Sequence, residues 1–191
     1  MIATLPLALR NRLAATILAA VSDADARRTL AAVAHAPEAW LAVEERHWAP
    51  LLIARARRAS EALAAVPPAR DAGLDAVLDV AATLYEAGLH FEVHEWLEPH
   101  WMAASGHTRE ALQGLIQAAV GWQHLANDNV AGARSLLSDG AARLHGRRLG
   151  RRDFDAFARA TADAVGSLPS AAPPPFPQRA SEATQHREES V

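Results

Sequence analysis

Residues 84–101 read LYEAGLHFEVHEWLEPHW and place histidines and glutamates between aromatic side chains. Successive residues of an α-helix are rotated by about 100°, so residues four apart, such as His94 and Glu98, share one face. The polar stripe and its borders consist of Phe91, His94, Glu98 and Trp101, with Glu95 at the edge and Glu92 further round. The pattern predicts an amphipathic helix over residues 90–103 whose polar groups are partly buried and need partners.

A second helix with a polar stripe is predicted in residues 112–124, which read LQGLIQAAVGWQH. The helical period gathers three polar side chains on one narrow face: Gln113, Gln117 and His124. Small residues that permit another helix to approach closely stand at Gly114, Ala118 and Gly121. A turn near residue 106 makes the two helices antiparallel neighbours. Counting outward from that turn sets Glu98 opposite Gln113 and His94 opposite Gln117.

The surrounding residues 71–166 are predicted to be helical throughout, because helix formers dominate and strand signals are absent. One helix is expected to end near Gly88, and the others to cover His90 to Ala103, Thr108 to Ala126, Val130 to Leu144 and, capped by Asp153, Phe154 to Val165. Short connections join antiparallel neighbours. The expected fold is therefore all-α, an up-and-down helical meander or bundle.

Outside this core we expect an N-terminal helical extension over residues 1–66 and a disordered tail over 168–191. In the extension, Ser22 is the expected N-cap of one helix, and Pro37 suits the first turn of the next. Pro50 is expected to interrupt that second helix, and a further helix should cover residues 51–65. The tail is rich in proline and charge and lacks apolar periodicity, which is typical of disorder.

The composition excludes several classes of protein. The chain has 191 residues and no cysteine, which excludes a disulfide-stapled domain and a cysteine-ligated zinc module. Its net charge is -3, which argues against a nucleic-acid binder that relies on charge. The apolar runs are too short to span a bilayer, and the N-terminus makes no convincing signal peptide. We therefore expect a cytoplasmic protein that binds neither membranes nor nucleic acids.

Two separated motifs resemble one known family. The first is Tyr85-Glu-Ala-Gly-x-x-Phe-Glu-x-His-Glu-x-x-Glu-x-x-Trp101, and the second is Leu112-Gln-Gly-Leu-Ile-Gln117, followed by His124 and Asn129-x-x-Gly-Ala133. In order and spacing they are similar to the bacterial family catalogued as domain of unknown function 309, over roughly residues 75 to 145. The resemblance implies a small all-helical fold, a three-helix meander, with no assigned activity. The family more often has Phe-Asn where this chain has Tyr85 and Glu86.

The polar stripes are interpreted first as a semi-buried pocket for a small polar ligand. The candidate residues of this pocket are Glu92, His94, Glu95, Glu98, Trp101, Gln113, Gln117 and His124. His94 and one glutamate would be the acid and base of any catalysis, although the sequence does not decide whether the protein is an enzyme. It contains no phosphate-binding glycine loop, nucleophile elbow or cysteine nucleophile.

Two other interpretations of the same residues stay open. The stripes could form a buried hydrogen-bond network that fixes helix register in a structural or protein-interaction module. Alternatively, His94, Glu98 and His124 could bind a divalent metal ion, as a metal-binding protein or hydrolase, since imidazole and carboxylate suit zinc, iron or manganese. The sequence leaves the cofactor and any homo-oligomer undecided.

Overall fold

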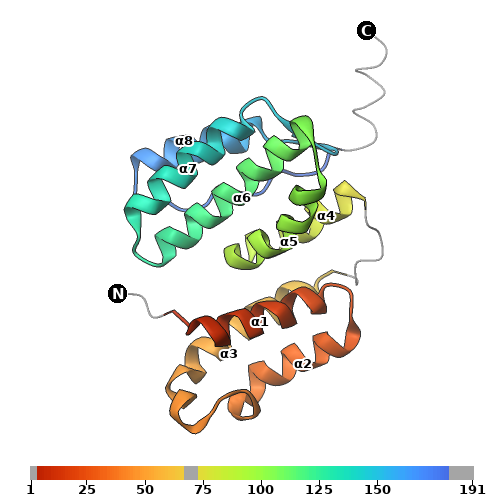
Figure 1. Cartoon of the computed structure of the whole chain (residues 1–191), viewed down its shortest axis with the longest axis vertical. Helices are drawn as coiled ribbons and strands as arrows, with labels where there is room; N and C mark the ends of the chain where they lie inside the picture. The colour runs from red at the N-terminus through yellow and green to blue at the C-terminus, as the bar shows by residue number, and fades with distance from the viewer. Residues whose placement is uncertain (1–3, 67–72, 181–191) are drawn as a thin grey trace. The chain divides into compact units, whose positions relative to one another are not determined.

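The computed structural model describes residues 4–66 and 73–180, and these residues form an all-α fold, as predicted (Figure 1). The chain divides into two compact units: Met1–Trp96 with Ala126–Asp128, and Leu97–Leu125 with Asn129–Val191. The first unit thus contains helices that the sequence analysis assigned to the core. Among the residues described, no helix is both long enough and apolar enough to cross a membrane.

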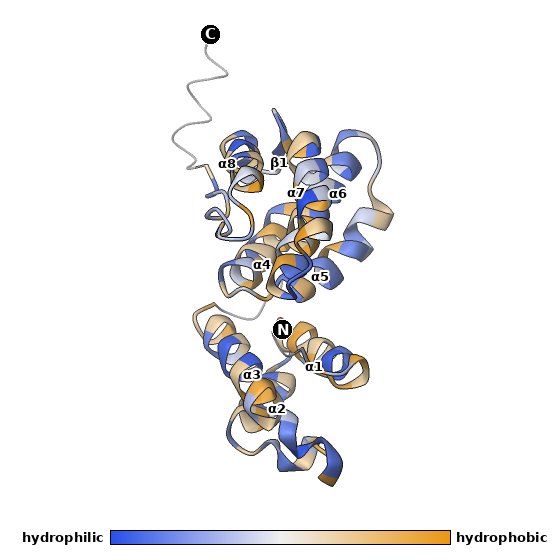
Figure 2. Ribbon diagram, turned by 90° about the vertical axis from the view of Figure 1, so that its left-hand side faces the viewer, coloured by the Kyte–Doolittle hydropathy of each residue, from blue (hydrophilic) through white to orange (hydrophobic). Residues whose placement is uncertain are grey.

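The first unit contains three N-terminal helices that pack against one another, followed by the start of the predicted core. Its elements are α1 (Leu7–Ala20), α2 (Ala24–His35), the 3-10 helices η1 (Pro37–Trp40) and η2 (Val43–Trp48), α3 (Ala49–Ala64) and α4 (Leu74–Glu86). Each of α1, α2 and α3 carries both apolar and polar residues (Figure 2). Leu13, Ile17, Leu30 and Leu52 are almost completely buried and form the core of these helices.

Two local predictions for this region were wrong, and a third was confirmed only for the start of the helix. Asp23, rather than Ser22, caps α2, because its carboxylate accepts from the backbone N–H of Asp25 at 2.8 Å. Pro37 does open a helix, but that helix stops after four residues, and η2 follows separately. Pro50 lies in the first turn of α3, where its missing N–H costs no hydrogen bond, so it starts a helix instead of interrupting one.

The turn between α4 and α5 (His90–Ala103) is closed by a Schellman motif at Gly88. The N–H of Gly88 donates to the carbonyl of Tyr85 at 2.8 Å, and the N–H of Leu89 donates to that of Leu84 at 2.9 Å. Gly88 has φ +66°, which favours glycine, and the predicted end of this helix is confirmed. The bounds predicted for α5 are also confirmed, and the helix continues through Pro99 to Ala103.

The second unit contains the C-terminal part of α5, together with α6, α7 and α8. The remaining elements are α6 (Gly106–Ala126), α7 (Val130–Leu144), the strands β1 (Arg148–Leu149) and β2 (Arg152–Asp153), and α8 (Asp155–Gly166). Helix α6 begins two residues before the predicted cap Thr108. The antiparallel hairpin of two-residue strands was not predicted. Asp153 nevertheless makes a capping bond, accepting from the N–H of Asp155 at 2.8 Å.

Helices α6 and α7 approach so closely that only glycine fits at their contact. A Cβ at Gly140 would lie 2.7 Å from the carbonyl oxygen of Gly114 and 2.9 Å from the amide nitrogen of Ala118. At Gly121, a Cβ would lie 2.8 Å from the side chain of Leu137. The small residues of α6 therefore permit a close helix contact, as predicted, and the helix that uses it is α7.

Residues 168–180 follow a defined path, which corrects the prediction that the disordered tail begins at residue 168. Phe176 is only 2% exposed, and its ring centroid lies 5.7 Å from that of Phe154 and 6.2 Å from that of Phe157. Nε of Arg152 donates to the carbonyl of Pro177 at 3.0 Å. A single aromatic anchor produces no periodicity, which is why the sequence pattern missed it. Residues 181–191 of the predicted tail lie outside the described residues.

Replacing Gly140 with alanine tests the close contact between α6 and α7. Alanine usually stabilises a helix interior by about 1 kcal/mol relative to glycine. At position 140 the new Cβ would meet backbone atoms of α6, so we expect the free energy of unfolding to fall by about 1–3 kcal/mol. Urea denaturation measures this, with Gly166→Ala as the control because open space surrounds Gly166. Equal stabilities of the two variants would contradict the close contact.

Candidate functional site

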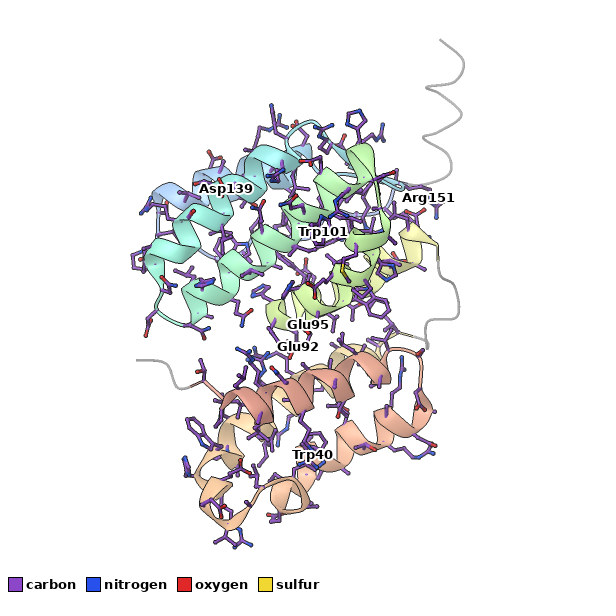
Figure 3. The ribbon with its side chains drawn as sticks, in the orientation of Figure 1. Trp40, Glu92, Glu95, Trp101, Asp139 and Arg151 are labelled. Atoms are coloured by element: carbon purple, nitrogen blue, oxygen red, sulfur yellow. The ribbon has the colours of Figure 1, made fainter. Side chains whose placement is uncertain are left out.

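The polar residues of α5 differ sharply in their exposure. Glu92 has a side chain that is 0% exposed, whereas those of His94 and Glu95 are 28% and 37% exposed. Figure 3 labels Glu92 and Glu95, which come from the same helix. The predicted stripe therefore separates into a buried group near the start of the helix and a half-exposed group further along it.

Glu92 is held by Arg55 of α3, a residue that the sequence analysis did not include in the site. Nη2 of Arg55 lies 2.9 Å and 2.8 Å from the two carboxylate oxygens of Glu92 and donates to them. Burying an ion costs several kcal/mol unless a well-placed opposite charge compensates it. Both carboxylate oxygens of Glu92 are thus engaged by a partner inside the first unit, and the pair fixes α5 against α3.

His94, Glu95 and Glu98 form a compact group along α5. One ligand atom from each of the three side chains lies within 4.8 Å of the other two, and all three residues are half-buried. His94 and Glu98 are four residues apart and Glu95 and Glu98 three apart, so the helix itself makes them neighbours. Nδ1 of His94 lies 3.4 Å from a carboxylate oxygen of Glu95. The group brings together an imidazole and two carboxylates, the donors that divalent transition metals prefer.

Trp101, Gln113 and Gln117 are not members of this group. Trp101 packs under Arg109, whose guanidinium carbon lies 4.1 Å from the ring centroid and whose Nη1 donates to the carbonyl of Trp101 at 2.9 Å. Gln113 and Gln117 are half-buried on α6. Oε1 of Gln117 is buried without a hydrogen-bond partner. The predicted pairing of Gln113 with Glu98 and of Gln117 with His94 stays a prediction.

His124 has a local partner at the turn between α6 and α7. Its Nδ1 lies 2.6 Å from Nδ2 of Asn129, and Oδ1 of Asn129 accepts from the N–H of Gly132 at 2.9 Å. A Cβ at Gly132 would lie 2.6 Å from Nδ2 of Asn129 and 2.8 Å from Nδ1 of His124, so a larger residue would displace these side chains. The motif Asn129-x-x-Gly132 is therefore a helix cap that also orients His124. A metal site shared by His124 and His94 stays a prediction.

Sequence reasoning also missed His90, which is only 9% exposed. Its ring centroid lies 5.0 Å from that of Tyr85 in an edge-to-face arrangement. Burial, together with the positive charges of Arg55 and Arg58, lowers the pKa of His90 from 6.5 to about 4. A signal existed for Arg55, which lies three residues after the buried Leu52 and four before the buried Ala59 and so shares their face. The sequence contained no comparable signal for the burial of His90.

A hollow between α7 and α8 contains none of the predicted site residues. Its walls are mostly apolar, with Ala141, Ala158 and Val165 among the lining residues and His145 and Arg159 at its border. Alanines offer few directional contacts to a ligand. The half-exposed group on α5 therefore remains the better candidate for chemistry.

The buried His90 should make the protein less stable in mild acid. Unfolded histidine has a pKa near 6.5, whereas that of folded His90 is about 4, so between these values only the unfolded state binds the proton. The free energy of unfolding should therefore fall by about 2–3 kcal/mol between pH 7 and pH 4.5 on account of His90. Urea denaturation at both pH values checks this. The fall in the free energy of unfolding should be smaller by this amount in His90→Gln, whereas the exposed control His35→Gln should show the same fall as the wild type. The same acid sensitivity in His90→Gln and the wild type would refute the assignment.

The comparisons with known proteins agree with the resemblance in the sequence motifs. The family model described as Domain of unknown function (DUF309) matches residues 78–136, from within α4 to within α7. This range contains His94, Glu95 and Glu98 as well as the His124 turn. No curated protein and no solved structure matches the chain. Over residues 78–136 the chain is thus similar to the family of the domain of unknown function 309.

Proposed function

We propose that helix α5 binds a divalent transition-metal ion through His94, Glu95 and Glu98. The observation that supports this is their convergence, with one ligand atom of each residue within 4.8 Å of the others. A single ion at about 2.0–2.2 Å from each donor would draw these atoms together. The helix already supplies the spacing, so only side-chain rotations are needed.

The chemistry of the donors selects the class of ion. One imidazole and two carboxylates suit zinc, iron or manganese, while the absence of cysteine removes the thiolates that soft ions prefer. Nδ1 of His94 already lies beside the Glu95 carboxylate, at 3.4 Å. A cation between the two groups replaces the proton that a charged histidine would carry, so metal and proton compete and acid weakens binding.

Half-exposure gives this group a different role from that of Glu92. Water reaches all three side chains, so an ion can enter without any opening of the core. Three protein ligands also leave coordination positions for water or a substrate, which is the arrangement of catalytic rather than structural zinc sites. A metal ion held there would activate a bound water molecule as a nucleophile, so hydrolysis is the class of reaction that such a site would support.

A second candidate function rests on Gln117. Its buried Oε1 has no hydrogen-bond partner, and an unsatisfied buried acceptor costs about 1–3 kcal/mol. A donor group of a small polar ligand would satisfy it. This observation favours the ligand-binding interpretation for the face of α6 that carries Gln113 and Gln117, separately from the metal ion on α5.

Metal binding should depend on His94 and Glu98. We expect the full chain, made without a histidine tag and freed of metal by a chelator, to bind Zn²⁺ or Mn²⁺ with one-to-one stoichiometry in isothermal titration calorimetry. His94→Ala and Glu98→Gln should each weaken this binding at least tenfold. The matched controls His35→Ala and Glu61→Gln replace exposed residues of the same types on α2 and α3 and should bind as the wild type does.

The stability of the same variants separates this proposal from a structural network. Replacing a half-exposed metal ligand should lower the free energy of unfolding of the metal-free protein by less than about 0.5 kcal/mol. If these residues instead belonged to a buried hydrogen-bond network, each replacement should lower the free energy of unfolding by about 1–3 kcal/mol. Absence of metal binding by the wild type, or equal affinity in wild type and variants, would refute the proposal.

A further inference from the structure

The N-terminus of α5 has no side-chain cap from the residue that precedes it. Leu89 is the N-cap residue, because its carbonyl accepts from the N–H of Val93 at 3.0 Å, and leucine has no polar side chain. The first amides of an α-helix have no acceptor within the helix and carry partial positive charge. Such an end binds anions when other donors lie beside it.

Arginines of α1 and α3 surround this end of the helix. Arg55 pairs with Glu92, and the guanidinium of Arg10 lies 4.3 Å from the ring centroid of Phe91. Arg58 is exposed on α3, and a Cβ at Gly88, two residues before α5, would lie 3.4 Å from its Nη1. Glu92 is thus engaged by Arg55, whereas Arg10 and Arg58 bring two more guanidinium groups to this end of the helix.

His90 adds a buried nitrogen atom that lacks a hydrogen-bond partner. The residue is only 9% exposed, and its Nε2 is buried without a partner, as is Nε of Arg55. Two unsatisfied buried nitrogens are costly, at about 1–3 kcal/mol each. Burial and then the positive charges of Arg55 and Arg58 lower the pKa of His90, so both guanidinium groups lie close enough to act on its ring.

We propose that this end of α5 binds a small phosphate-type oxyanion through Arg58, the imidazole of His90 and the first amides of the helix. The site lies within the first unit and is distinct from the metal group, which begins one helical turn later at His94. A phosphate group offers several acceptor oxygens for donors that come from both α3 and α5, and the planar guanidinium of Arg58 suits a bidentate contact. The proposal does not rest on the metal-binding proposal.

Inorganic phosphate is the probe that tests this site. We expect its addition to the metal-free full chain to shift the NMR signals of the His90 imidazole and of the Phe91 and Glu92 amides in a saturable way. Arg58→Gln should weaken phosphate binding at least tenfold. Arg57→Gln is the matched control, because it removes the same charge from the exposed neighbouring position and should change the affinity less than twofold.

Two further readouts make the outcome decisive. Bound phosphate should raise the pKa of His90, because the anion favours the imidazolium. Acetate, with two oxygens and one charge, should bind more weakly, and equal binding of acetate would refute the phosphate assignment. Unshifted His90 signals, or equal losses in Arg57→Gln and Arg58→Gln, would refute the site. Arg58→Gln should keep the wild-type melting temperature and Zn²⁺ affinity, so failure here is distinguishable from failure of the metal site.

Discussion

The buried ion pair between Arg55 and Glu92 determines how α5 presents its polar residues. A carboxylate that is completely buried must keep its partner, so this pair fixes the rotation of α5 about its own axis within the first unit. At about 100° per residue, His94, Glu95 and Glu98 lie roughly 200°, 300° and 240° round the helix from Glu92. Anchoring Glu92 against α3 therefore turns His94 away from α3, whereas Glu95 lies only about 60° round the helix from Glu92.

Helix bounds and local groups were predictable because they depend on nearby residues. The 3.6-residue period, Gly88 and Asn129 marked the ends of α4, α5 and α7. The proximity of His94 and Glu98 likewise follows from helix geometry alone. The pairing of Arg55 with Glu92 was not predictable in the same way, because 37 residues separate them and several arginines of α3 are equivalent by composition. The burial of Phe176 was not predicted because its partners, Phe154 and Phe157, lie about 20 residues earlier in the chain.

The two proposed sites on α5 follow from one arrangement of charge. The helix N-terminus and the arginines of α1 and α3 make the first turn positive, where an anion is favoured. One turn later, two carboxylates and an imidazole make the surface negative, where a cation is favoured. Glu92 lies between the two regions and forms an ion pair with Arg55. A short helix thus carries opposite binding preferences, with a buried structural carboxylate between them.

Neighbouring glutamates on α5 have different roles, and the free energies of unfolding of Glu92→Gln and Glu95→Gln test this difference most directly. In urea denaturation of the metal-free protein at pH 7, Glu92→Gln should lower the free energy of unfolding by about 2–3 kcal/mol, because it leaves the charge of Arg55 uncompensated. Glu95→Gln should change the free energy of unfolding by less than about 0.5 kcal/mol. Equal losses in the two variants would contradict the division of α5 into a structural and a binding part.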